Sequence, residues 1–165
     1  MIIGVPAESS PGEKRVALTP DGVKTLASKG LEVVVESGAG QGAWASDDEY
    51  SAAGAKIVSN AIEAADLIIK VIGPEDGSPE SEAMRLKPGS ALIALLFPHT
   101  NVDTIAVLAQ RNITAFAMDL MPRISRAQSM DALSSMSTIA GYQAALIAAE
   151  RLPKFFPMLM TAAGT

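Results

Sequence analysis

The chain has 165 residues, of which 48% are hydrophobic and 19% are charged, and this balance indicates one globular domain long enough to bury a core. The formal net charge of −5 argues against nucleic acid or an anionic membrane surface as the main partner. The absence of cysteine excludes a disulfide framework, a thiolate metal site and a thiol nucleophile.

Six short apolar runs alternate with stretches that carry helix signals. Strands are predicted at residues 2–5, 31–36, 55–58, 67–72, 91–97 and 113–118. Helices are predicted from residue 20 to just before Gly30, at 46–53, 60–65 and 79–85, after Asn101, and at about 131–151. Strands and helices that alternate at this spacing indicate βαβ units. We therefore predict an α/β fold, a Rossmann-like (flavodoxin-like) mostly parallel sheet with helices on both faces, ending in a long Ala-rich helix.

Capping residues mark where the shorter helices begin. The predicted N-caps are Thr19, Ser46, Asn60 and Asn101. The helix after Asn101 is expected to present Val102, Ile105 and Leu108 on one face.

The last predicted helix is rich in small residues. Its aligned positions are Leu133, Met136, Ala140, Ala144 and Ile147. Gly141 lies inside the helix, where it costs about 1 kcal/mol relative to alanine, so we expect the helix to pack closely against something. An apolar tail follows at residues 155–160, and it either folds back, docks a partner or leads into a further domain.

A polar loop between the last strand and the last helix is the first candidate site. Arg123 offers a planar fork of donors, Gln128 an amide, Asp131 a carboxylate and Ser134 a hydroxyl. The structural alternative is that Asp131 is an ordinary N-cap, Ser134 a first-turn residue and Arg123 a surface cation.

Two cations and a glycine-rich turn are further candidates. Arg15 and Lys70 follow or end predicted strands, where ligands collect in open α/β sheets, although both could be solvated cations. Residues 38–42 read G-x-G-x-G and not G-x-G-x-x-G, so we predict a strand-to-helix turn and no phosphate site. His99, the only histidine, is predicted to lie in a loop, and a lone histidine forms no metal site.

The segment from Pro122 to Tyr142, which begins PRISRAQSMDALSSM, resembles the loop-and-helix signature of the proton-translocating NAD(P) transhydrogenase alpha subunit. The resemblance implies that this loop reaches over the nicotinamide of NAD(H) held by a neighbouring domain. The positions that match are Arg123, Gln128, Asp131 and Ser134, with Arg123 and Asp131 as the catalytic pair. Hydride would pass from NADH to NADP+, coupled to proton translocation.

Residues 4–8, 13–20 and 22–23, and also Lys70, resemble positions shared by transhydrogenases and alanine dehydrogenases. In alanine dehydrogenases the equivalents of Arg15 and Lys70 hold the substrate carboxylate and carbonyl, so the two form a candidate substrate pocket here. Those enzymes also use a histidine as acid–base group. His99 lies in a turn pattern closer to the transhydrogenase form and is expected to be offset from that position.

The resemblance also implies how the chain is organised. Residues 1–130 would form the N-terminal α/β subdomain, and residues 131–165 a long helix and tail leading toward a dinucleotide-binding domain absent from this chain. That domain would make most of the contacts with NAD(H). NADP(H) would be bound by a partner component, and the complete enzyme would also contain a membrane domain.

The expected assembly is a homodimer with no nucleic acid partner, cytoplasmic or peripheral on the cytoplasmic side of the inner membrane. Residues 1–6 lack a basic segment and a long apolar run, and no stretch reaches ~18 apolar residues, so we expect neither signal peptide nor membrane span in this chain. The isolated chain is expected to be inactive. The alternatives are an NAD-dependent amino-acid dehydrogenase of the alanine dehydrogenase type and a non-catalytic docking module.

Overall fold

A computed structural model describes residues 1–74 and 81–154 of the chain. The chain divides into two compact units, Met1–Met121 and Pro122–Thr165. The first unit holds the sheet and the helices that cover it. The second begins with a loop that contains a 3₁₀ helix, η3 (Ser125–Met130), and continues into the long helix α6 (Ala132–Arg151).

Six parallel strands form one sheet in the first unit, as the sequence predicted. In chain order they are β1 (Ile2–Val5), β2 (Glu32–Glu36), β3 (Lys56–Val58), β4 (Leu67–Ile72), β5 (Ala91–Leu95) and β6 (Thr114–Ala117). They lie in the order β3-β2-β1-β4-β5-β6, which is the Rossmann order and not the flavodoxin-like one. The order reverses between β1 and β4. The carboxyl ends of these two strands therefore border the crevice where open α/β sheets bind ligands.

Two strands end earlier than the sequence pattern predicted. After β5, the backbone N–H of Leu96 donates to Oδ1 of Asp119 (2.7 Å), and Phe97 adopts a left-handed conformation with φ of 45°. After β6, the chain forms the 3₁₀ helix η2 (Met118–Leu120). The Asp119 carboxylate thus accepts the hydrogen bond that a neighbouring strand would otherwise accept from Leu96 at the end of β5.

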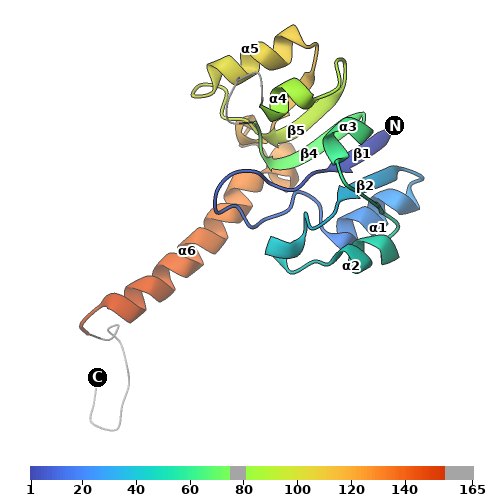
Figure 1. Ribbon diagram of the computed structural model, residues 1–165. Coiled ribbons are helices and arrows are strands. Elements are labelled where there is room, and N and C mark those ends of the chain that lie inside the picture. Colours follow the sequence, from blue (N-terminus) through green and yellow to red (C-terminus); the bar gives the residue numbers. More distant parts are fainter. Residues whose placement is uncertain (75–80, 155–165) are drawn as a thin grey trace. The chain divides into compact units, whose positions relative to one another are not determined.

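Helices cover both faces of the sheet (Figure 1). On one face, α1 (Pro20–Ser28) and α2 (Asp47–Ala52) bury Val23 and Tyr50 in a cluster with Val33 and Val35 of β2. Val34 lies between those two valines and belongs to the opposite cluster, because successive side chains of a strand point to opposite faces. That second cluster lies under α3 (Ala61–Ala64), α4 (Glu82–Arg85) and α5 (Val102–Gln110).

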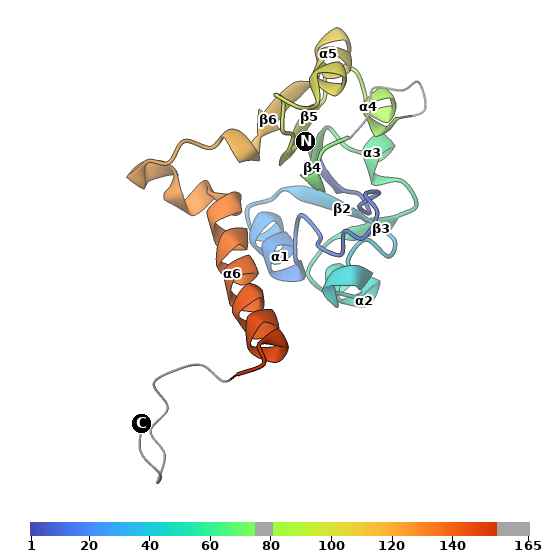
Figure 2. The ribbon, with the colours of Figure 1, turned by 90° about the vertical axis from the view of Figure 1, so that its left-hand side faces the viewer.

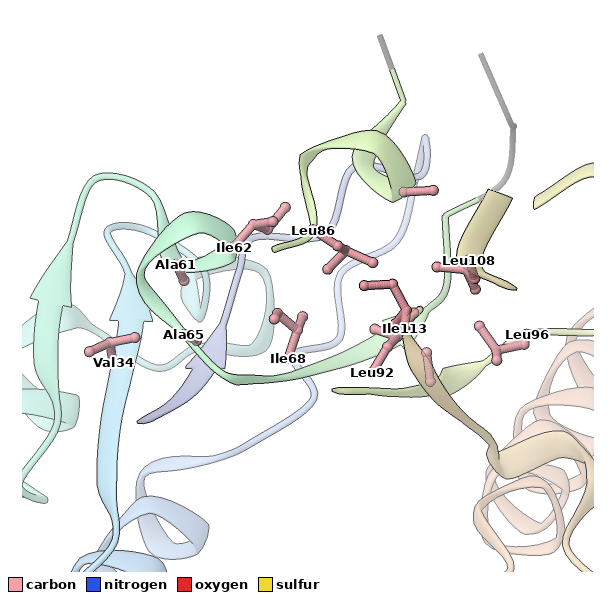
Figure 3. Close-up of a cluster of buried hydrophobic side chains, with 12 residues drawn as sticks. Val34, Ala61, Ile62, Ala65, Ile68, Leu86, Leu92, Leu96, Leu108 and Ile113 are labelled. Atoms are coloured by element: carbon pink, nitrogen blue, oxygen red, sulfur yellow. The ribbon is translucent and has the colours of Figure 1, made fainter. Parts of the chain in front are cut away.

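The second cluster joins the central strands to their covering helices (Figure 3). Ile68 of β4 and Leu92 of β5 are fully buried, and they share the cluster with Ile62, Leu86 and Leu108 from the helical side. Truncating such a side chain to alanine typically costs about 2–5 kcal/mol. This packing fixes β4, and with it the residues at its carboxyl end.

Three of the four predicted N-caps are confirmed, and one is corrected. The side chains of Thr19, Ser46 and Asn60 each accept a hydrogen bond from a backbone N–H of the helix that follows. Asn101 precedes α5 but makes no such bond, because its amide donates to the carbonyl of Leu96 (2.9 Å) and closes the turn after β5.

The predicted apolar face of α5 also needs correction. Leu108 is buried as expected, and Ile105 packs against the same cluster. Val102, however, is 63% exposed, whereas Thr104 is buried. The first residue of α5 therefore faces away from the core, and the hydroxyl-bearing Thr104 takes the buried place in the same turn.

Helix α6 begins and ends where the sequence predicted, with Asp131 as N-cap (Figures 1 and 2). None of its residues is buried, and a Cβ added at Gly141 would meet no atom within 4 Å. Among the described residues of its own unit nothing packs against Gly141, and the expected close packing of α6 stays a prediction. The apolar tail at residues 155–160 and the predicted start of a helix at Pro79 lie outside the described residues. No helix among the described residues is both long and apolar enough to span a bilayer.

Candidate functional site

At the switch point between β1 and β4, a carboxylate of the chain itself binds the backbone of β4. β1 pairs with β4 only at Ile3 and Gly4, and the chain leaves the sheet after Val5. Glu8 turns back, and its carboxylate accepts hydrogen bonds from the backbone N–H groups of Val71 (2.7 Å) and Ile72 (3.3 Å). The side chain of Glu8 thus satisfies the two donors of β4 that β1 no longer reaches.

Lys70 lies in β4 beside this carboxylate and is buried, with 2% of its side chain exposed. Its ammonium contacts the carboxylate of Glu82 at the first position of α4 and lies 4.0 Å from Oε2 of Glu8. A buried ammonium is tolerated only when it is paired, and here the two carboxylates provide that pairing.

The charge state of Glu8 reflects opposing influences. Burial raises its pKa above the ordinary value, and the charge of Glu82 acts in the same direction. The N–H groups of Val71 and Ile72 and the charge of Lys70 oppose this increase. Burial prevails, so the pKa of Glu8 lies above its ordinary value.

Arg15 makes a second ion pair on the loop that follows β1. Its Nε donates to Oε1 of Glu13 (2.8 Å) and its terminal nitrogen to Oε2 (2.6 Å), which is the two-pronged geometry of guanidinium and carboxylate. The side-chain hydrogen bond from Arg15 is the main reason that the pKa of Glu13 falls to about 2. The hydrogen bond to Glu13 also raises the pKa of Arg15, with a smaller contribution from the charge of Glu8.

The loop before α6 joins two of its four predicted site residues by hydrogen bonds, Asp131 and Ser134. Oδ1 of Asp131 accepts from the backbone N–H of Ser134 (2.9 Å), and Oδ2 accepts from the Ser134 hydroxyl (2.6 Å). These bonds, with a smaller effect from the charge of Arg123, hold the pKa of Asp131 below its ordinary value. Gln128 is linked to the group only through its backbone, because its carbonyl accepts from the N–H of Asp131 (3.3 Å).

These side chains are accessible. Arg123, Gln128 and Ser134 are exposed and Asp131 is half-buried. Asp131 is also the N-cap that the structural alternative predicted. The two interpretations are compatible, since a capping carboxylate that is fixed by the helix presents its neighbours in a defined arrangement.

The glycine-rich turn is built for packing. Oδ1 of Asp47 accepts from the N–H of Gly38 (2.9 Å), so a donor that a phosphate would need is already used. A Cβ at Gly40 would lie 2.5 Å from the ring of Tyr50, and one at Gly42 2.7 Å from the carbonyl oxygen of Lys14. The glycines therefore permit close approach of backbone, as a strand-to-helix turn requires. His99 is exposed in the turn after β5.

Sequence reasoning missed the carboxylates that pair with the two cations. Glu8 and Glu13 lie in the N-terminal segment that carries the resemblance, but nothing in their spacing gave them a role. A lysine inside a buried strand does require a carboxylate partner, and this signal pointed to such a partner without identifying it. The sequence could not identify Glu82 as the partner of Lys70, because only the fold brings α4 to the end of β4.

Known proteins resemble this chain over nearly its whole length. A family profile described as "Alanine dehydrogenase/PNT, N-terminal domain" matches residues 4–140. An NAD(P) transhydrogenase alpha-subunit protein of Rhodospirillum rubrum is 50% identical over 171 residues, covering 100% of this chain and 44% of that protein. The alanine dehydrogenase of Bacillus subtilis is 36% identical over 156 residues, covering 93% of this chain and 39% of that protein.

Solved structures give the same picture. A transhydrogenase from Sinorhizobium meliloti has a TM-score of 0.88 at 45% identity, covering 99% of this chain and 48% of that one. An L-alanine dehydrogenase has a TM-score of 0.81 at 31% identity, covering 91% of this chain and 40% of that one. This chain spans less than half the length of each of these proteins.

Proposed function

Because the chain belongs to the family of alanine dehydrogenase/PNT N-terminal domains, we propose that it is the N-terminal portion of the NAD(H)-binding component of an NAD(P) transhydrogenase. The observation that carries the proposal is the hydrogen-bonded pair of Asp131 and Ser134 at the start of α6, with Arg123 exposed on the same loop. Relatives named NAD(P) transhydrogenase subunit alpha, from several bacteria, support it over the whole chain.

The donor set of this loop suits a nicotinamide. The loop exposes a guanidinium, an amide and a hydroxyl, and the hydroxyl is hydrogen-bonded to the Asp131 carboxylate. These groups match the donors and acceptors of a carboxamide and a ribose. Gln128, Asp131 and Ser134 would hydrogen-bond around that group, and Arg123 would fix the orientation of the loop. The dinucleotide, held mainly by a following domain, supplies the hydride chemistry, with NADP(H) on a partner component.

Positioning is the contribution expected of these side chains. Hydride transfer between two nicotinamides needs neither a nucleophile nor a general base from the protein, so alignment is what accelerates it, and alignment can contribute several kcal/mol. The Ser134 hydroxyl is held by Asp131, and the helix fixes Asp131 in turn. The cluster is therefore ordered before any ligand arrives, which lowers the entropic cost of alignment.

The assembly that we propose is a proton-translocating, homodimeric enzyme on the cytoplasmic side of the inner membrane, in which this chain alone is inactive. The alternative of an amino-acid dehydrogenase rests on Arg15 and Lys70, and both contact carboxylates of the chain. Turnover of NADH with pyruvate and ammonia by the complete protein would support that alternative. The docking-module alternative rests on residues 155–160, which lie outside the described residues.

The test is single-turnover hydride transfer in the complete enzyme. We expect Arg123→Ala and Asp131→Asn to slow the transfer step about tenfold or more while changing NADH affinity less, because positioning acts on the transition state. Arg151→Ala and Asp48→Asn are matched controls, since they remove the same charges from exposed positions outside the loop. Unchanged transfer rates in both loop variants would refute the assignment.

A further inference from the structure

The turn of residues 41–44 after β2, called the Trp44 turn below, presents the most exposed large apolar side chain among the described residues. Trp44 is the only tryptophan of the chain, and it is 95% exposed. The other three residues of the turn are exposed as well. Single exposed apolar side chains are common, so this exposure gains meaning only from the backbone that produces it.

The backbone of Trp44 adopts a conformation that disfavours its residue type. Its φ of 62° and ψ of 28° are left-handed, where a Cβ meets steric repulsion. The N–H of Trp44 donates to the carbonyl of Gln41 (3.2 Å), and the N–H of the buried Ala45 donates to that of Gly40 (3.0 Å). The residues on both sides therefore impose the strained conformation, and backbone strain of this kind concentrates at functional sites.

The Trp44 turn also stands on a close-packed base. A Cβ at Gly42 would lie 2.7 Å from the carbonyl oxygen of Lys14, so the turn lies directly against the loop that follows β1. On the other side, Ser46 and Glu49 close the capping box at the start of α2. A large, rigid ring on a fixed backbone loses little conformational entropy when it is buried against another molecule.

The charges around the Trp44 turn indicate what such a molecule is. Residues 38–46 contain no charged side chain, which is the composition found at the centre of protein interfaces. Asp47 and Glu49 follow directly, and backbone N–H donors from Gly38 and Ser46 lower the pKa of both carboxyls. An uncharged patch with an indole is therefore bordered by carboxylates that are ionised at neutral pH, and its complement is an apolar pocket with a basic rim.

We propose that the Trp44 turn is a docking surface for a partner protein, with Trp44 as an anchor that enters an apolar pocket rimmed by basic side chains. Tryptophan is among the residues that most often dominate the binding energy of an interface. The identity of the partner rests on the proposed function, which requires an NADP(H)-binding component to dock on this one. The location does not rest on it, because Trp44 belongs to the first unit and the loop before α6 to the second.

The test is single-turnover hydride transfer in the complete enzyme, measured against the concentration of purified NADP(H)-binding component. Trp44→Ser should raise the half-saturating concentration of that component about tenfold or more and leave the rate at saturation unchanged. Val102→Ser is the matched control, since it removes an apolar side chain that is 63% exposed on α5, and it should change neither quantity. Arg123→Ala should give the opposite pattern, a slower rate at saturation, so the two proposals can fail separately.

Calorimetric titration of the same two proteins without nucleotide gives a readout independent of activity. Added salt should weaken association of the native protein, because it screens the complementary charges. Trp44→Gly should associate as weakly as Trp44→Ser and yet resist urea at least as well as the native protein, since glycine adopts the left-handed conformation without strain. Native-like association of both Trp44 variants would overturn the proposal, as would a native protein that does not bind the component.

Discussion

In two clusters of this chain, a carboxylate accepts a backbone N–H and lies near a cation, but one cluster is buried and the other is at the surface. In the first unit, Glu8 accepts two backbone N–H groups and lies beside Lys70, and both side chains are almost fully buried. In the second, Asp131 accepts from the backbone and hydroxyl of Ser134 near the charge of Arg123, at the surface. Burial decides what each cluster can do, since buried charges must satisfy one another, whereas exposed ones stay available to a ligand.

The largest effect that this comparison predicts is on stability. Lys70→Met should lower the free energy of unfolding by about 3–5 kcal/mol, because it leaves Glu8 and Glu82 buried without their cation. Lys56→Met is the matched control, since the pair of Lys56 with Glu32 is exposed and contributes less than about 1 kcal/mol. Urea denaturation measures both variants. Equal losses would mean that the buried cluster is no more important to the fold than a surface pair.

Substitution of one glycine in each unit should have an intermediate effect on stability, and the two effects should be opposite in sign. Gly40→Ala should destabilise the chain by about 1–3 kcal/mol, because the added Cβ would overlap the ring of Tyr50 and the carbonyl oxygen of Ala45. Gly141→Ala should instead raise the stability of α6 by about 1 kcal/mol, since nothing is near and alanine favours helix. Urea denaturation measures the first and amide hydrogen exchange in α6 the second. A loss of protection in Gly141→Ala would indicate a partner surface at that position.

The smallest effect is on proton binding, and there the two clusters should differ in sign. The raised pKa of Glu8 means that its contribution to stability is present below its unfolded value near 4.5 and is lost as pH rises through its folded value. The lowered pKa of Asp131 means that its contribution is present above its unfolded value near 3.8 and is lost as pH falls through its folded value. Carboxyl-carbon NMR titration should place the pKa of Glu8 above 4.5 and that of Asp131 below 3.8. Shifts in the same direction would remove the distinction between the clusters.

Local sequence signals account for the order and type of most elements of this fold. The β-branched runs specify their strands, and the capping residues Thr19, Ser46 and Asn60 specify helix starts, because these signals act within a few residues. The polar residues of the loop before α6 were also identified from the sequence. Their proposed role with a nicotinamide is still a prediction that the single-turnover experiment tests.

Only the tertiary structure decided how the charges pair. Lys70 is 12 residues from Glu82 and 62 from Glu8, and the three meet only because β1 and β4 are neighbours in the sheet and α4 lies over β4. Contacts between elements distant in the sequence also determine the strand order and the early end of β5, where Asp119 accepts a hydrogen bond from Leu96. Backbone propensity acts over a few residues, whereas the desolvation of a buried charge depends on every element around it, and that sum exists only in the folded chain.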